Sequence, residues 1–325
     1  MAVNVALIGC GGWGKNLARN LHALGVLSQI VDPSPAAAAM AADFGVAHSD
    51  TPDAVFANAA IDAVVIATPA ETHVPLGLAA LSAGKHVYVE KPIALATADA
   101  RTLADAADST GLTLMVGHLL QYHPIYRALA ALVGEGRLGT VRHIISSRMN
   151  LGMVRNEENV MWSFSPHDVS MVLGLAGAPR RVRAVGSAFL QRGIEDVVTA
   201  HVDCANGVVA EIRSSWCHPE KEQKLIVVGD TAMAVFDDTA PWEQKLQITD
   251  FTIDRSAPRP KAVRGEVAAI AVPQGEPLRL EMQHFVDAVA NGTRPLTDAR
   301  EAVAVLAVLQ AGQQSLESAG EWINV

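Results

Sequence analysis

The sequence predicts an α/β protein, with an N-terminal doubly wound parallel sheet followed by a C-terminal α+β domain that has a large, mostly antiparallel open sheet. Short apolar runs alternate with helical patterns up to about residue 120, which indicates repeated βαβ units. Strand-like runs then follow one another from residue 181 to 249. At 325 residues the chain is long enough for two cores. We therefore predict two domains, residues 1–120 and 121–325.

The first domain is predicted from buried strands and from the helices between them. Ser34 and Pro35 suit a helix N-cap and first helical position, and Gly84 suits a helix end. The strands are short and apolar, as expected for strands buried on both faces of a parallel sheet. Predicted strands are 3–8, 29–31, 63–67, 87–89 and 112–116, and predicted helices follow Gly14 and span 35–44, 71–82 and 97–109.

The second domain is predicted to be richer in strands. Asn206-Gly207 and Gly229-Asp230 are turn dipeptides that connect some of these strands as hairpins. Residues 251–279 are rich in Pro, Arg and Gly and are predicted to form an extended loop. Strands are expected at 140–149, 181–190, 195–204, 208–217, 223–229, 232–237 and 245–249, and helices at 124–133, through Val169, Val172 and Leu175, and at 280–291 and 298–318.

Composition argues against several classes of protein. Half of the residues are hydrophobic, but no apolar run approaches the roughly 18–20 residues of a membrane span. The apolar start is too short for a signal peptide. Three scattered cysteines argue against a disulfide framework, so we expect a cytoplasmic location. A net charge of −9 disfavours nucleic acid as a partner. The histidines and cysteines lack zinc-ligand spacing, so no metal is expected.

A glycine-rich turn, Gly9-x-Gly11-x-x-Gly14, links the first predicted strand to the first predicted helix, with Gly12 and Trp13 inside it. In that context the spacing is the dinucleotide fingerprint of a Rossmann domain. Glycines allow a tight turn, close approach of the backbone to a pyrophosphate, and close packing of helix on strand. The phosphates then meet unpaired amides at the helix N-terminus. We therefore expect a dinucleotide site; the alternative is a glycine-rich turn alone.

Asp32 follows the second predicted strand and bears on the choice of dinucleotide. A carboxylate there can accept hydrogen bonds from both ribose hydroxyls of an adenosine, and it repels a 2′-phosphate. The next Lys or Arg along the chain is Lys85. The sequence therefore favours NAD over NADP.

Glu90-Lys91-Pro92 ends the apolar strand 87–89 abruptly. Pro92 cannot donate a ladder hydrogen bond, and it biases Lys91 away from helical geometry. Two charged side chains are thereby placed at the carboxyl end of a strand, the edge where open α/β sheets bind ligands. Such a pair is usually solvated surface, so its role depends on the dinucleotide site before it.

Arginines are concentrated between residues 127 and 155. This stretch contains five arginines, and Glu135 is its only acid before residue 156. Arginine suits bidentate recognition of phosphate or carboxylate. A solvated face of a helix and a strand is the alternative interpretation.

Several motifs together resemble the Gfo/Idh/MocA oxidoreductase family over nearly the whole chain. They are the glycine-rich turn, Thr68-Pro69 with His73, Ala83-Gly84-Lys85-His86-Val87 running into Glu90-Lys91-Pro92, Gly117-His118, and Gly136-x-Leu138-Gly139. The resemblance implies a Rossmann domain before an α/β domain whose open sheet carries the substrate face. It also implies a homo-oligomer, a dimer or tetramer, formed through that sheet.

The resemblance further implies an NAD-dependent dehydrogenase with specific site residues. Lys91 would lie beside the nicotinamide and the substrate hydroxyl, and Glu90 near the nicotinamide ribose. The implied cofactor contacts are Gly9, Gly11, Gly12, Trp13, Gly14, Asp32, Thr68, Pro69, His73, Glu90 and Lys91.

A second catalytic motif of the family often reads Asp-x-x-x-His. His167 fits the histidine, but the position four residues earlier is Ser163. Asp168 comes directly after His167 and, like a backbone carbonyl, is a candidate to orient the ring in place of the missing acid.

The string from Arg148 to Asp168 resembles a branch of sugar-nucleotide dehydrogenases that oxidise C3 of UDP-N-acetylglucosaminuronate. It implies a substrate with a diphosphate and a carboxylate, in agreement with the arginine-rich stretch. The implied substrate contacts are His118, Tyr122, Arg148, Asn150, Arg155, Trp162, His167 and Asp168.

We therefore expect hydride transfer from a ring secondary alcohol to NAD, with Lys91 and His167 as catalytic residues. Either residue could accept the hydroxyl proton: Lys91 if its pKa is lowered, or His167 if Lys91 stays charged and stabilises the alkoxide. Two alternatives remain: a dehydrogenase of a free sugar, inositol or polyol, and an NAD-binding regulator without catalysis.

Overall fold

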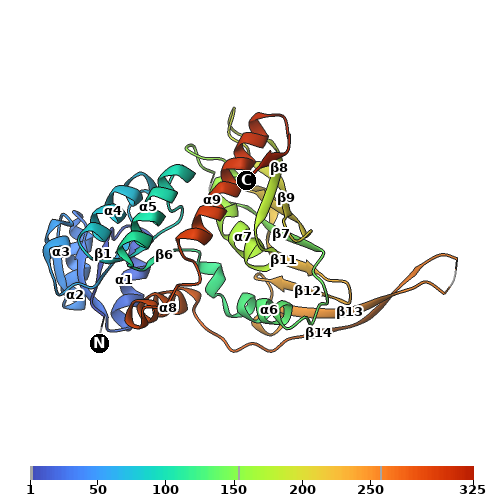
Figure 1. Ribbon diagram of the computed structural model, residues 1–325, viewed down its shortest axis with the longest axis horizontal. Helices are drawn as coiled ribbons and strands as arrows, with labels where there is room; N and C mark the ends of the chain where they lie inside the picture. The colour runs from blue at the N-terminus through green and yellow to red at the C-terminus, as the bar shows by residue number, and fades with distance from the viewer. Residues whose placement is uncertain (1–2, 153, 257) are drawn as a thin grey trace. The chain divides into compact units, whose positions relative to one another are not determined.

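The computed structural model describes residues 3–152, 154–256 and 258–325, which form two compact units (Figure 1). Unit 1 runs to Tyr122 and also contains Gly275–Leu306. Unit 2 comprises His123–Gln274 and Ala307–Val325. Within the described ranges, no helix is long and apolar enough to cross a membrane.

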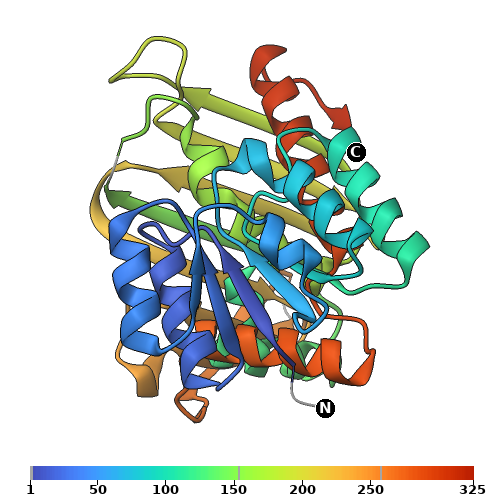
Figure 2. The ribbon, with the colours of Figure 1, turned by 90° about the vertical axis from the view of Figure 1, so that its left-hand side faces the viewer.

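Unit 1 contains a six-stranded parallel sheet in the order β3-β2-β1-β4-β5-β6, as predicted for a doubly wound fold (Figure 2). The strand order reverses between β1 and β4, so ligands are expected at the carboxyl ends of these neighbouring strands. The strands are β1 (Val5–Ile8), β2 (Leu27–Val31), β3 (Ala47–Ser49), β4 (Ala63–Ile66), β5 (His86–Val89) and β6 (Leu114–Val116).

The helices of unit 1 follow the strands in the alternation that the sequence predicts. Ser34 caps α2 by accepting a hydrogen bond from the Ala37 amide across 3.3 Å, and Gly45 ends that helix with a left-handed φ of 66°. The helices are α1 (Gly14–Ala23), α2 (Pro35–Phe44), α3 (Asp53–Ala57), α4 (His73–Ser82) and α5 (Thr97–Thr110), with short 3-10 turns η1 (Ala70–Thr72) and η2 (Leu119–Tyr122). The sequence did not predict β3 or α3, because both are too short to show a periodicity.

One correction concerns the domain boundary near the C-terminus. The sequence assigned residues 275–306 to the second domain, but helix α8 (Pro277–Asn291) and the start of α9 (Ala299–Glu317) belong to unit 1. Helix α8 packs beside α1, and its residues Leu278, Met282 and Phe285 join the core formed by β1, α1 and β5 (Figure 1). Burial of this apolar face, at helical spacing, explains why α8 packs against the parallel sheet.

Unit 2 is built on a nine-stranded sheet in the order β14-β13-β12-β11-β7-β10-β9-β8-β15. All neighbours are antiparallel except β7 and β10, which confirms the predicted open, mostly antiparallel sheet. The strands are β7 (His143–Leu151), β8 (Pro179–Ser187), β9 (Val197–Cys204), β10 (Val209–Ser215), β11 (Cys217–Val228), β12 (Ala232–Asp237), β13 (Leu246–Asp254), β14 (Lys261–Ala269) and β15 (Ile323–Asn324).

Helices α6 (Pro124–Gly134) and α7 (Val160–Ala176) pack on this sheet, α6 against β12 and α7 against β7, β9 and β10. The turn η3 (Trp242–Gln244) precedes β13. Helix α7 begins earlier than predicted, because Asn159 caps it by accepting hydrogen bonds from the Met161 and Trp162 amides. Residues 164–168, which precede the predicted helical residues Val169, Val172 and Leu175, therefore lie within the helix.

The expectation of an extended loop at 251–279 was wrong for much of that segment. Strand β13 continues to Asp254 and pairs with β14 in an antiparallel hairpin, which projects from the rest of the sheet in Figure 1. The β-branched residues Val263 and Val267 suit a strand, while the prolines lie outside β14. The strand signal was therefore masked by the neighbouring Pro and Gly residues.

Candidate active site

The glycine-rich turn lies at the carboxyl end of β1, next to the end of β4. Gly9 has a φ of +92°, and a Cβ there would lie 2.6 Å from the carbonyl oxygen of Ala67. A Cβ on Gly14 would lie 2.2 Å from the carbonyl oxygen of Gly9. Both positions therefore require glycine. A Cβ on Gly11 or Gly12 would meet nothing within 4 Å, so that side of the turn faces open space.

The N-terminus of α1 is uncapped. Trp13 precedes the helix without making a side-chain capping hydrogen bond, and the first turn contains no acid. The first amides of a helix lack intrahelical partners and favour an anion. The open glycine face and these amides fit the pyrophosphate of a dinucleotide.

Asp32 ends β2 beside this turn and is held by two backbone amides. Its Oδ2 accepts from the Cys10 amide across 2.7 Å, and its Oδ1 accepts from the Ser34 amide across 2.9 Å. Burial raises the pKa of Asp32, but the hydrogen bonds from Ser34 and Cys10 outweigh burial and leave the pKa below its usual value. The charged carboxylate fits the ribose diol of NAD.

His73 connects the loops that follow β4 and β5. Its Nδ1 lies 2.7 Å from the Pro92 carbonyl oxygen, and its Nε2 lies 2.9 Å from the Thr68 carbonyl oxygen. Burial lowers the pKa of His73, so the ring is neutral at pH 7 and donates to one carbonyl at a time. The buried His73 ring thus connects the loop of Thr68-Pro69 to the loop of Lys91-Pro92. The peptide bond between Lys91 and Pro92 is cis.

Glu90 is the best-connected acid at this edge. Its Oε1 accepts from the Trp13 indole Nε1 across 2.6 Å and from the Tyr88 hydroxyl across 3.1 Å, and its Oε2 accepts from the Lys91 amide across 3.3 Å. A Cβ on Gly117 would lie within 3.0 Å of both the Tyr88 hydroxyl and the Glu90 carboxyl. The end of β6 therefore passes close against this acid and requires glycine.

Lys91 follows Glu90 and is half-buried. Within the described ranges its ammonium makes no ion pair shorter than 4 Å. Its charge nevertheless lowers the pKa of Glu90, although burial is the larger effect and raises that pKa overall. Lys91 is therefore placed at the carboxyl edge of the sheet as a cation that forms no ion pair with an acid of the described ranges.

His118 and Tyr122, predicted as substrate contacts, take different positions in unit 1. His118 is buried, and its Nδ1 lies 2.6 Å from Oε2 of Glu301 at the start of α9. The Tyr122 hydroxyl lies 3.0 Å from Thr297 Oγ1, and its ring belongs to the core beside α8. This packing argues against direct substrate contact by Tyr122.

Unit 2 contains a buried ion pair next to His167. Asp168 Oδ2 accepts from Arg148 Nε across 2.6 Å, and Asp168 Oδ1 accepts from Ser146 Oγ across 2.6 Å. The Asp168 side chain is 2% exposed and that of Arg148 is 16% exposed, so both are withdrawn from water. Asp168 is therefore engaged with β7, rather than standing free to orient His167. Arg148 is likewise engaged.

His167 lies on α7 one helical turn after Ser163, so the two side chains share a helix face. The helix thus preserves the spacing of the family motif while offering a hydroxyl in place of an acid. His167 belongs to unit 2 and Lys91 to unit 1.

The remaining predicted substrate residues lie near the start of α7 and the end of β7. Arg155 is half-exposed and lies 3.7 Å from Glu158. Trp162 donates from its indole to Gln313 across 3.1 Å. Asn150 Oδ1 is buried and has no hydrogen-bond partner among the described residues. Asn150 therefore has unused hydrogen-bonding capacity.

Sequence reasoning missed Glu281 of α8, which is fully buried. Burial raises its pKa well above the usual value, and charge on Glu90 raises it further. A signal existed in the sequence: an acid stands within the apolar helical spacing of Leu278, Met282 and Phe285.

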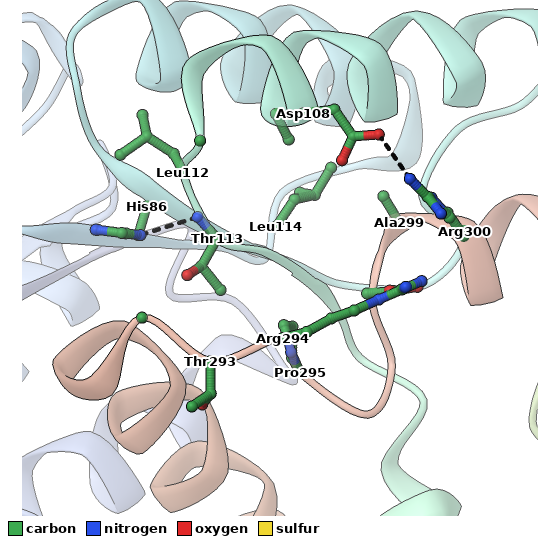
Figure 3. Close-up of a pocket in the computed structure, with 14 residues that line it drawn as sticks. His86, Asp108, Leu112, Thr113, Leu114, Thr293, Arg294, Pro295, Ala299 and Arg300 are labelled. Carbon is green, nitrogen blue, oxygen red and sulfur yellow. Dashed lines mark hydrogen bonds and ion pairs between the residues drawn. The ribbon is translucent and has the colours of Figure 1, made fainter.

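A cavity of about 300 Å³ in unit 1 lies away from these groups. Figure 3 shows His86, Thr113 and Leu114 lining it, and these lie at or just before the amino ends of β5 and β6. Its arginines are paired: Arg300 with Asp108, as Figure 3 shows, and Arg294 with Asp298. Because His86, Thr113 and Leu114 mark the amino ends of β5 and β6, the cavity lies at the opposite strand ends from Glu90. Within the described part of the chain, no group of three or more His, Cys, Asp or Glu residues is arranged to hold a metal.

Comparison with known proteins identifies relatives of both units. Residues 3–118 match the model of an oxidoreductase family with an NAD-binding Rossmann fold, and residues 126–235 match the GFO/IDH/MocA C-terminal domain. UDP-N-acetylglucosamine 3-dehydrogenase of Acidithiobacillus ferrooxidans is 28% identical over 300 residues, covering 89% of each chain. Its structure matches with a TM-score of 0.85 at 26% identity, covering 98% of this chain and 99% of that one.

Two further relatives differ in their described activity or pathway. Inositol 2-dehydrogenase of Rhizobium meliloti is 32% identical over 229 residues, 66% of this chain and 69% of that protein. The structure of GenD2 from gentamicin A biosynthesis, solved with NAD, has a TM-score of 0.81 at 25% identity and covers 99% of this chain and 96% of that one.

The doubly wound sheet, the glycine turn and Asp32 define an NAD-binding oxidoreductase. The chain belongs to the GFO/IDH/MocA oxidoreductase family and is an NAD-dependent dehydrogenase. Unit 1 corresponds to the NAD-binding part of that family, and unit 2 contains its C-terminal domain.

Proposed function

We propose that the protein oxidises a secondary alcohol on the ring of a nucleotide sugar, at C3 of a UDP-N-acetylhexosaminuronate or a related UDP-sugar. The observation that carries the reaction is the position of Lys91, a cation at the carboxyl edge of β5 beside the half-buried Glu90. The substrate class is supported by the likeness to UDP-N-acetylglucosamine 3-dehydrogenase, which spans nearly the whole chain.

Lys91 and His167 divide the proton chemistry in this proposal. NAD, held by the glycine-rich turn and Asp32, would supply the hydride acceptor for this reaction. The substrate hydroxyl must then lose its proton as the hydride leaves. A positioned base contributes roughly 10²–10⁴-fold to such a step. Lys91 either takes this proton or, as an ammonium, stabilises the developing alkoxide while His167 takes it. His73 holds the loop of Lys91 in place through the Pro92 carbonyl oxygen.

A second candidate, oxidation of inositol or a free sugar, is favoured by the state of Arg148. Its guanidinium is engaged by Asp168, which weakens the case for a diphosphate clamp at that position. Inositol 2-dehydrogenase is also among the relatives. Arg155 is then the arginine that distinguishes the two candidates, because it is half-exposed and its acid lies at 3.7 Å.

The reaction is tested by measuring NADH formation with UDP-N-acetylglucosamine, its uronate, myo-inositol and xylose. We expect turnover with a UDP-sugar, abolished in Lys91→Ala, while NAD still binds in a direct titration. Lys261→Ala on the exposed strand β14 is the matched control and should retain wild-type activity. Near-normal turnover in Lys91→Ala would contradict the catalytic assignment.

The substrate class is tested separately with Arg155→Gln. For a UDP-sugar, loss of this charge should raise KM at least several-fold with a smaller effect on kcat. Turnover only of inositol or xylose, with KM unchanged in Arg155→Gln, would establish the second candidate instead.

A further inference from the structure

Glu281 occupies a position in α8 where the helix otherwise presents apolar residues. Leu278, Met282 and Phe285 lie at helical spacing around it, and all three are buried in the core of unit 1. Glu281 itself is 0% exposed. An ionised carboxylate in such surroundings is costly unless it is paired and hydrogen-bonded. A buried acid that the proposed chemistry does not use therefore requires an explanation.

The groups that face Glu281 come from two segments, strand β5 with the residue that follows it and the turn η2, and none of these groups is a cation. On β5 it faces Tyr88, whose ring packs edge-to-face on that of Phe285 with the ring centroids 5.8 Å apart. Directly after β5 it faces Glu90. From η2 it faces Tyr122. Both Glu281 oxygens are shut off from water, and within the described chain neither makes a hydrogen bond of ordinary geometry.

Other titratable groups nearby are already engaged. His284, on the same helix, accepts from the Leu296 amide across 3.0 Å, and His118 lies 2.6 Å from Glu301. The charge of Lys91 lowers the pKa of Glu90, the acid at the end of β5. Glu281 therefore lacks the compensation that Lys91 and Trp13 give to Glu90.

The Tyr88 hydroxyl connects the two acids. It donates to Glu90 Oε1 across 3.1 Å, and charge on either Glu281 or Glu90 raises its pKa. Burial and the two acids together keep Tyr88 a neutral hydroxyl. Two carboxyls that share a buried site cannot both ionise easily, and their protons come off as a coupled pair.

This pair is linked to the cofactor site through Trp13. The indole of Trp13 belongs to the glycine-rich turn and donates to Glu90 across 2.6 Å. A dinucleotide spans the point where strand order reverses, with its adenosine toward Asp32 at the end of β2. Its nicotinamide half then lies toward the ends of β4 and β5, where Glu90 is found.

We propose that Glu281 shares an ionisable proton with Glu90 through Tyr88, and that this proton is released when the positively charged, oxidised nicotinamide binds. The balance is simple: the protonated pair and NAD⁺ give the ionised pair with NAD⁺ bound and one proton in solvent. NADH carries no charge on its nicotinamide ring and leaves the proton in place. Glu281 is a positioning residue, because it acts through Tyr88 and Glu90. The inference rests on the NAD site and not on the identity of the sugar.

The experiment is calorimetric titration of NAD⁺ and of NADH into the protein from pH 6 to 9, in two buffers of different ionisation enthalpy. We expect NAD⁺ binding to release up to one proton and to tighten up to tenfold per pH unit within the titration window. NADH binding should release none. In Glu281→Gln the release should disappear and the Kd for NAD⁺ should become flat over this range.

The control is Glu276→Gln, at the start of the same helix but half-exposed, which should retain the wild-type proton release. Release that persists in Glu281→Gln would come from another group and would overturn the proposal, as would pH-independent NAD⁺ binding in the wild type. If Glu281→Gln does not fold, infrared difference spectra of the wild type decide. The carbonyl stretch of a protonated carboxyl must weaken with NAD⁺ and not with NADH.

Discussion

The two units contain buried acids that are compensated in opposite ways. In unit 2, Asp168 accepts from Arg148 and Ser146 at 2.6 Å each, so a cation and a hydroxyl satisfy it. In unit 1, Glu90 accepts from the Tyr88 hydroxyl, Glu281 makes no hydrogen bond of ordinary geometry within the described chain, and burial raises the pKa of each. The first arrangement fixes a charge in place. The second keeps a proton available.

The difference follows from what surrounds each acid. A buried carboxylate next to a guanidinium gains Coulomb energy and hydrogen bonds that offset its desolvation, so loss of one partner is costly. An acid in an apolar core without a cation beside it, such as Glu281, has little compensation and responds by holding a proton. Groups of the second kind are enriched at functional sites. The comparison therefore assigns a structural role to Asp168 and a titrating role to the Glu90–Glu281 pair.

The largest expected effect comes from breaking the buried ion pair between Asp168 and Arg148 in unit 2. Asp168→Asn removes the charge that balances Arg148, whose side chain is only 16% exposed. Breaking one partner of a buried pair costs about 3 kcal/mol or more, which chemical denaturation would measure as a lower free energy of unfolding. The control is Asp250→Asn, because Asp250 pairs with Arg137 on the surface and such pairs contribute little. Equal effects of the two substitutions would show that Asp168 is not a structural anchor.

The next effect concerns the pH dependence of stability. Glu281 and Glu90 have raised pKa values, so above their ordinary pKa the folded protein binds more protons than the unfolded chain. The contribution of this pair to the free energy of unfolding therefore falls as pH rises, by about 1.4 kcal/mol per pH unit for each retained proton. Glu281→Gln needs no proton, so its unfolding free energy should fall less between pH 5 and 8. Parallel wild-type and variant curves would exclude a proton on Glu281.

Much of the fold could be predicted from the sequence, since the βαβ units carry strong local signals. Residues 35–44 form a helix with the predicted cap, and strand 232–237 has its predicted bounds. Longer-range effects could not be predicted in the same way. Helix α8 joins unit 1 because its apolar face packs against α1 and β5, and β14 is a strand because β13 pairs with it. Both depend on partners distant in sequence or on a neighbouring strand.

The candidate site was predictable to a similar degree. Glycine requirements and strand-end charges are local, so the sequence could place Gly9 and Gly14 in a tight turn and Lys91 at the end of a strand. The engagement of Arg148 by Asp168 could not be predicted, because it depends on β7 packing against α7. Tyr122 was assigned to the substrate, but it lies in the core. Glu281 was missed because an acid on an apolar helix stripe becomes informative only once Tyr88 and Glu90 are placed beside it.

The smallest expected effect concerns Trp13, which links the titrating pair to the cofactor turn. Trp13→Phe removes the indole donor to Glu90, and because Trp13 is 43% exposed, water replaces part of that hydrogen bond. The loss should weaken NAD⁺ binding two- to fivefold, about 0.5–1 kcal/mol. That hydrogen bond lowers the pKa of Glu90, so its removal raises this pKa and lets the pair hold its proton to higher pH. The loss of affinity should therefore be larger at pH 7 than at pH 9 in calorimetric titrations. A loss of the same size at both pH values would show that Trp13 only contacts the cofactor and does not influence the titrating pair.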